Sequence, residues 1–114
     1  MESEQFDELV AEAVKGLPGW VREALDNVEL FVEADPPPGQ QNLLGLYHGI
    51  PLTKRGNHYT GALPDRITLY RSTLERSSFG DPKRLRHLVA HTVEHELAHH
   101  FGISDDRLRE MGKY

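Results

Sequence analysis

The first part of the chain places apolar residues at the spacing of an α-helix. A first helix is predicted after Ser3, a possible N-cap, and Gly16 followed by Pro18 ends the pattern. A short second helix is predicted over residues 18–25, because Asp26-Asn27 breaks the pattern there. The apolar positions of the two helices are Phe6, Leu9, Val10, Ala13, Val14, Leu17, Trp20, Val21 and Leu25.

Three strand-like runs occupy the middle of the chain. They are Val28–Val32, Leu43–Tyr47 and Arg66–Tyr70, and in the last of them Ile67 and Leu69 alternate with more polar neighbours. Turn residues separate the runs, at Asp35-Pro36, Arg55-Gly56-Asn57 and Leu63-Pro64-Asp65. We expect the three runs to form one small sheet.

The most regular pattern begins at Asp81-Pro82, which suits an N-cap and a first helical residue, and ends at Gly102. It predicts a helix of about 20 residues, roughly 30 Å long. One stripe is apolar and a second consists of histidines: Leu85, Val89, Val93, Leu97 and Phe101, against His87, His91, His95 and His99. After Gly102, the run Ser104-Asp105-Asp106 can cap a short C-terminal helix through Leu108 and Met111.

Composition narrows the class of protein. With 114 residues, 38% of them hydrophobic, residues 1–114 are expected to form a single α+β domain. The net charge is −5 and no basic block occurs, so nucleic acid is not an expected partner. No apolar run reaches the roughly 18 residues of a membrane span, so we expect no membrane association and a cytoplasmic location. The absence of cysteine leaves imidazole and oxygen as metal ligands.

Five of the seven histidines fall between His87 and His100, and two of them belong to His95-Glu96-Leu97-Ala98-His99. In this HExxH pattern, two imidazoles lie one helical turn apart on one face and can bind one zinc ion. Glu96 can then stand beside the metal as a general base, without being a ligand.

The pattern continues beyond the second histidine. A third protein ligand requires the chain to turn back toward the metal, and Gly102 permits such a turn. The carboxylates that follow are Asp105 and Asp106, and proximity alone leaves both possible as the third ligand. Capping of the short C-terminal helix is the other role open to Asp105.

The extended motif, HExxHxxGxxD, resembles the metzincin-like variant of the zincin metalloproteases in which aspartate replaces the usual third histidine. Residues 44–52, 63–71 and 95–105 are similar to segments of a family of very small bacterial zincin-like metallopeptidases, and the resemblance covers most of residues 20–110. Larger metzincins have a methionine turn after the third ligand. Here the only downstream methionine is Met111, six residues beyond Asp105.

The resemblance implies a zincin-like fold, with a small β-sheet packed on an active-site helix and flanking helices. It implies one Zn²⁺ per chain, held by His95, His99 and Asp105, with Glu96 as the catalytic base. The substrate would be a peptide or protein whose backbone adds antiparallel to an edge strand. Two alternatives remain open: a non-catalytic zinc-binding module, and a metal-dependent hydrolase of a non-peptide substrate.

The remaining candidates are less specific. His91 and His99 are eight residues apart, about 12 Å along a helix, so one zinc ion cannot bind both, and His91 is expected outside the ligand set. His87 and His100 are expected to be ordinary surface or core positions. Spacing cannot choose an oxyanion-stabilising residue among Tyr47, Tyr59, Tyr70 and His58.

Overall fold

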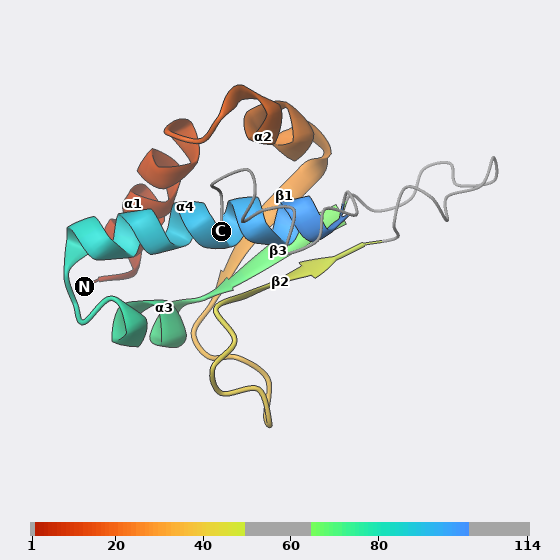
Figure 1. Cartoon of the computed structure of the whole chain (residues 1–114). Coiled ribbons are helices and arrows are strands. Elements are labelled where there is room, and N and C mark those ends of the chain that lie inside the picture. Colours follow the sequence, from red (N-terminus) through yellow and green to blue (C-terminus); the bar gives the residue numbers. More distant parts are fainter. Residues whose placement is uncertain (1, 50–64, 101–114) are drawn as a thin grey trace, which may run out of the picture.

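The computed structural model describes residues 2–49 and 65–100 of the chain (Figure 1). In chain order the elements are α1 (Ser3–Lys15), α2 (Gly19–Ala24), the 3₁₀ turn η1 (Leu25–Asn27), β1 (Val28–Glu33), β2 (Gly45–His48), β3 (Asp65–Tyr70), α3 (Arg71–Ser77) and α4 (Pro82–His100). Within these residues, the predicted helices and strands are confirmed with shifts of one or two residues at their ends. The α+β class is confirmed as well.

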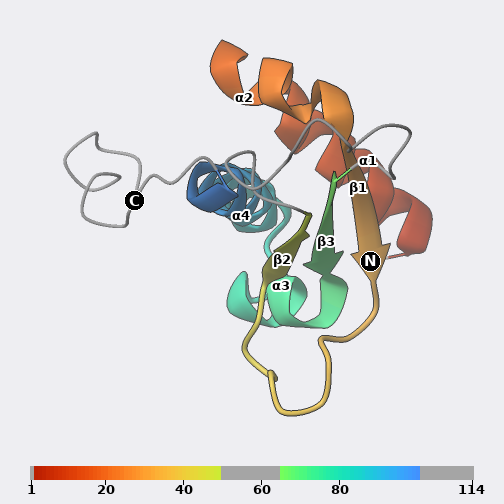
Figure 2. The same cartoon turned by 90° about the vertical axis from the view of Figure 1, so that its right-hand side faces the viewer.

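The three strands form one sheet in the order β1-β3-β2 (Figure 2). β1 pairs with β3 in parallel, from Val28 opposite Asp65 to Glu33 opposite Tyr70. β2 pairs with β3 in the antiparallel sense, with Tyr47 opposite Ile67. β3 is therefore the central strand, and β2 is an edge strand.

β3 is more buried than its alternating sequence predicts. Ile67 and Leu69 are fully buried as expected, but Thr68 and Tyr70 are only 4% and 2% exposed. The register explains Thr68, which lies between Phe31 of β1 and Leu46 of β2 on the same face of the sheet. The alternating sequence predicts that this face of β3 is exposed to solvent. Side chains of β1 and β2 cover it instead.

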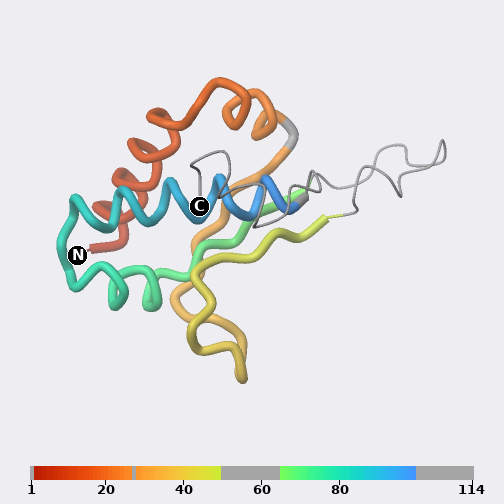
Figure 3. The backbone as a smooth tube through the Cα atoms, viewed as in Figure 1, coloured from red at the N-terminus to blue at the C-terminus, as the bar shows by residue number. Residues whose placement is uncertain are grey.

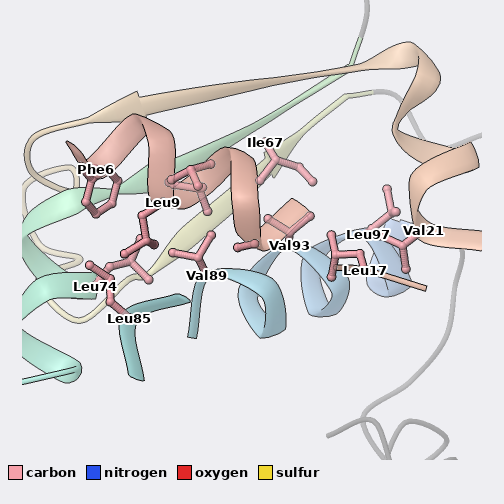
Figure 4. Packing of buried hydrophobic residues seen from close by; sticks show 13 residues of the cluster. Phe6, Leu9, Leu17, Val21, Ile67, Leu74, Leu85, Val89, Val93 and Leu97 are labelled. Atoms are coloured by element: carbon pink, nitrogen blue, oxygen red, sulfur yellow. The ribbon is translucent and has the colours of Figure 1, made fainter. Parts of the chain in front are cut away.

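The main core lies between α1, α4 and the sheet (Figure 4). The apolar stripe of α4 is confirmed in the described part of the chain, because Leu85, Val89, Val93 and Leu97 are at most 1% exposed. Phe6 and Leu9 of α1 and Ile67 of β3 belong to the same cluster. The fifth residue of the predicted stripe, Phe101, lies outside the described residues.

The start of α1 differs from the prediction. The N-cap is Glu2, whose backbone N–H donates to Gln5 Oε1 at 3.1 Å, so Ser3 is the first helical residue. A capping box can use Glu2 because Gln5 stands three residues after it. The Ser3 hydroxyl instead accepts a hydrogen bond from Arg71 Nη1 at 3.0 Å, which links α1 to α3.

α3 was not predicted from the sequence. It follows β3 without a loop, and buries only Thr73 and Leu74, too few apolar positions to show a helical period. Phe79 (φ 56°) and Gly80 (φ 73°) then reverse the chain in the left-handed region. This turn delivers the chain to the start of α4.

The predicted cap of α4 is confirmed, because Asp81 Oδ1 accepts a hydrogen bond from the backbone N–H of Lys83 at 3.0 Å. Figure 3 traces α4 as a continuous coil that ends beside β2 and β3. Within residues 2–49 and 65–100, no helix is both long enough and apolar enough to cross a membrane. Gly102 and the predicted C-terminal helix lie outside the described residues.

Candidate metal centre

β2 approaches α4 very closely at Gly45. A Cβ atom at Gly45 would lie 2.8 Å from Thr92 Cγ2 and 3.2 Å from the carbonyl oxygen of Thr68. The first of these distances is shorter than Cβ atoms show in proteins and the second is tight, so the close approach of the strand requires glycine at this position. The absence of a side chain at Gly45 therefore sets the distance between the edge strand and the helix.

The same pair of elements meets again two residues further along β2, where the backbone N–H of Tyr47 donates to Glu96 Oε1 at 3.2 Å. Two strand residues span about 6.8 Å and four helical residues about 6 Å. β2 and α4 run in the same direction, so Gly45 lies beside Thr92 and Tyr47 beside Glu96. This match of spacing brings an edge strand to the HExxH motif.

His95, Glu96 and His99 converge at this end of α4. Each offers one ligand atom, and these atoms lie within 4.8 Å of one another. The rings of His95 and His99 meet edge to face, with centroids 4.4 Å apart. Two nitrogens bound to one tetrahedral zinc ion are about 3.4 Å apart, so small side-chain rotations would bring these imidazoles to a shared ion. The histidine pair therefore fits a zinc site.

His91 lies one turn before His95, and their rings stack with centroids 5.8 Å apart. Burial lowers the pKa of His91, and the neighbouring charges of His95 and His87 lower it further, against an opposing effect of Glu94. His91 is not one of the three residues whose ligand atoms converge in the described part of the chain. It lies beside the histidine pair as a partly buried ring.

A cavity of about 300 Å³ opens beside the cluster. The segment before β2 forms one wall, and α4 forms the other. The lining residues are Asn42, Leu43, Leu44, Gly45, His91, Thr92, His95 and Glu96. Two residues of the HExxH motif thus face a space that a small molecule or a side chain can enter.

Four residues are candidates from the sequence for stabilising an oxyanion near the metal. Of these, Tyr47 contacts Glu96, and it does so with its backbone N–H. The Tyr47 hydroxyl points elsewhere, donating to Asp65 Oδ2 at 2.7 Å. Tyr70 is buried instead, where burial and the charge of Glu33 raise its pKa. Tyr59 and His58 lie outside the described residues.

Asp65 was missed as a residue of this region. In the sequence it belongs to the turn signal Leu63-Pro64-Asp65. It comes within hydrogen-bonding distance of Tyr47 only because β2 pairs with β3. Its neighbour at the end of β2 is Gly49. Asp105 and Asp106 lie outside the described residues, so the identity of the third ligand stays a prediction.

A family model described as zincin-like metallopeptidase matches residues 25–113 of the chain. The chain belongs to this family. The match begins at η1 and contains the whole sheet together with α3 and α4, so the resemblance inferred from the motif is confirmed. No curated protein matches the sequence. The HExxH motif lies on the longest described helix of the chain, and α1 and α2 precede the matched region.

Proposed function

We propose that the chain is a zinc-dependent peptidase. Its active site would lie at the end of α4, where it would hydrolyse the peptide bonds of a substrate. The observation that carries the proposal is the convergence of His95, Glu96 and His99 within 4.8 Å, directly beside the edge strand β2. Membership of the zincin-like metallopeptidase family supports it. His95, His99 and Asp105 would hold the ion, one per chain. When bound, zinc would act as a Lewis acid that polarises the scissile carbonyl and acidifies a water molecule.

Glu96 is the residue proposed to move the proton. Its carboxylate stands next to both histidines, and Oε1 accepts the Tyr47 N–H, so Oε2 is the oxygen proposed to take the proton. It would accept a proton from the attacking water and deliver it to the leaving amine. The helix fixes the spacing of the three backbone positions, so the Glu96 carboxylate and the two imidazoles belong to one site.

β2 is proposed to bind the substrate backbone. Tyr70 N–H donates to the carbonyl of Leu44, so residues 44, 46 and 48 direct their backbone groups toward β3. Gly45 and Tyr47 direct theirs away from β3. The Tyr47 N–H donates to Glu96 Oε1, so the carbonyl groups of Gly45 and Tyr47 are the groups proposed to accept hydrogen bonds from the substrate backbone. An extended peptide can pair antiparallel with an edge strand, and its backbone would then pass Glu96.

The packing of α4 favours catalysis over a purely structural metal. Leu85, Val89, Val93 and Leu97 bury one side of the helix in the apolar core. A metal that served only as a staple would be expected where the apolar core is too small to hold the chain. The histidines instead lie at the partly exposed end of a helix that is already anchored.

The test combines metal analysis with a substrate screen. Zinc-loaded protein is incubated with a mixture of peptides of varied sequence, and cleavage is followed by mass spectrometry. We expect hydrolysis that a chelator stops and zinc restores. Glu96→Gln keeps the size of the side chain but cannot act as the base, so cleavage should fall by about 10³-fold or more while zinc content and melting temperature stay near wild type. His87→Gln, on an exposed turn of the same helix, is the matched control.

Three results would contradict the proposal. Cleavage at the wild-type rate in Glu96→Gln would exclude the proposed base. If no peptide is cleaved, and loss of His95 or His99 unfolds the domain, the ion stabilises the fold and the chain is a zinc-binding module. Zinc-dependent cleavage of an ester or nucleic acid but not of any peptide would identify a hydrolase of another class.

A further inference from the structure

A carboxylate is buried at the start of the central strand. Asp65, the first residue of β3, is 6% exposed, although aspartate is rarely buried unless its charge is balanced or hydrogen-bonded. It accepts the Tyr47 hydroxyl at 2.7 Å. Asp65 takes no part in the proposed hydrolysis, so the burial of its carboxylate needs a separate explanation.

Gly49 packs against the same carboxylate. A Cβ atom on Gly49 would lie 2.5 Å from both Cγ and Oδ1 of Asp65, which leaves no room for any other residue. Gly49, the residue directly after β2, therefore lies against Asp65. The carboxylate is enclosed by Gly49 on one side and held by Tyr47 on another.

Tyr47 makes two hydrogen bonds in different directions. Its hydroxyl donates to Asp65 within the sheet, and its backbone N–H donates out of the sheet to Glu96 Oε1. Because Tyr47 is on an edge strand, its backbone N–H is fixed only as firmly as that strand is. The anchored phenol reduces the freedom of this part of β2.

We propose that Tyr47 is the positioning residue for Glu96, with Asp65 as its anchor. The inference rests on the proposed function of Glu96 as the base. A glutamate side chain has several rotamers, and a proton acceptor must be held within a fraction of an ångström of its working position. The Tyr47 N–H holds one carboxylate oxygen, and the Asp65 hydrogen bond holds the strand that carries this N–H.

The first experiment measures hydrogen exchange at single backbone amides by NMR, in the metal-free chain of residues 1–114. Tyr47→Phe removes one oxygen atom and the hydrogen bond to Asp65. The residue 47 amide should then exchange about tenfold faster, since a hydrogen bond involving a charged partner contributes about this factor. Glu96→Ala removes the acceptor and should also accelerate exchange. Adding Tyr47→Phe to Glu96→Ala should have little further effect, because both changes act on one contact.

Thr73→Val is the matched control. Thr73 Oγ1 donates to the Leu43 carbonyl at 2.7 Å, a hydrogen bond of the same length that ties α3 to the segment before β2. Thr73→Val should change exchange at residue 47 less than about twofold. Equal acceleration in Thr73→Val and Tyr47→Phe would overturn the proposal, because any loosening near β2 would then suffice. Unchanged exchange in Tyr47→Phe would overturn it too.

Asp65→Asn gives a second measure that does not remove the phenol. Its amide oxygen is a weaker acceptor of similar size, so exchange at residue 47 should rise by less than in Tyr47→Phe but more than in Thr73→Val. If Tyr47→Phe does not fold, this comparison decides the question. Exchange equal to wild type in a folded Asp65→Asn would then contradict the anchor.

The activity measurement separates this inference from the proposed function. With a peptide found in the screen, Tyr47→Phe should lower kcat about tenfold, change KM less than twofold and leave zinc content unchanged. If Glu96→Gln retains full cleavage, the proposed base is wrong, while the exchange experiment still shows whether Tyr47 holds Glu96. If Glu96→Gln is inactive and Tyr47→Phe has normal kcat, the positioning role is wrong and the base stands.

Discussion

Gly45 and Thr92 lie so close together that no side chain larger than hydrogen fits between β2 and α4 at this point. The contact is one helical turn before Glu96, and it determines how near the edge strand comes to the HExxH motif. The geometry of the candidate site therefore depends on a residue that carries no functional group.

Gly45→Ala should move β2 away from α4. The added methyl group would overlap Thr92, and relieving this overlap should lower the free energy of unfolding by about 1–3 kcal/mol. Urea unfolding measures the loss. Gly19→Ala is the control, because a Cβ there meets nothing within 4 Å and lies in a helix, so stability should hold or rise slightly. A Gly45→Ala protein as stable as wild type would show that the strand moves freely.

Protein purified without chelator should carry about one zinc ion per chain, since the histidine pair and one carboxylate complete a single site. His95→Ala and His99→Ala should each lose the metal, whereas His87→Ala, two turns before His95, should keep it. Elemental analysis after gel filtration measures the content. Zinc retained in both His95→Ala and His99→Ala would place the site elsewhere.

Asp105→Ala should weaken zinc binding by about 100-fold or more, because it removes one of three proposed ligands. Asp106→Ala should change the affinity by less than about threefold. Competition with a chromophoric chelator gives both dissociation constants. The opposite ranking of the two variants would move the third ligand by one residue.

His91 should make the metal-free protein less stable as the solution becomes more acidic. Burial first, and the charges of His95 and His87 next, lower its pKa in the folded protein below the ordinary 6.5. The unfolded chain therefore takes up a proton at higher pH than the folded protein. The contribution of His91 to the free energy of unfolding consequently falls as pH drops through 6.5 toward the folded-state pKa, and this contribution changes no further below both pKa values.

The measurement is urea unfolding at several pH values with a chelator present, for wild type and His91→Gln. Wild type should lose more stability on acidification than the variant, and zinc-loaded His91→Gln should keep its metal. An NMR titration of His91 gives the pKa directly. A value at or above 6.5 would contradict the expected effect of burial.

Local patterns in the sequence predicted the part of the site that lies on one helix. The spacing of His95, Glu96 and His99 fixes their common face because a helix repeats every 3.6 residues. Asp81 could also be predicted as the N-cap of α4, because capping involves only residues that are close in the sequence. Ser3 was misplaced by one residue, because Glu2 and Gln5 form the alternative cap.

Contacts between distant segments could not be predicted in this way. Tyr47 and Glu96 are 49 residues apart, and their hydrogen bond exists only because Gly45 lets β2 approach α4. In the sequence, Asp65 looks like an ordinary turn aspartate. Its hydrogen bond with Tyr47 depends on the register between β2 and β3. No spacing rule along the chain encodes either contact.

Because α1 packs against α4, the region that matches the family and the region that packs into one core begin at different residues. The family match starts at residue 25, but Phe6, Leu9, Val10 and Ala13 of α1 cover the apolar side of the helix that carries the motif. A shortened chain starting at residue 25 would retain the whole matched region and still leave this side of α4 open to water. Such a fragment should aggregate, whereas in the chain that includes α1 this side of α4 stays covered.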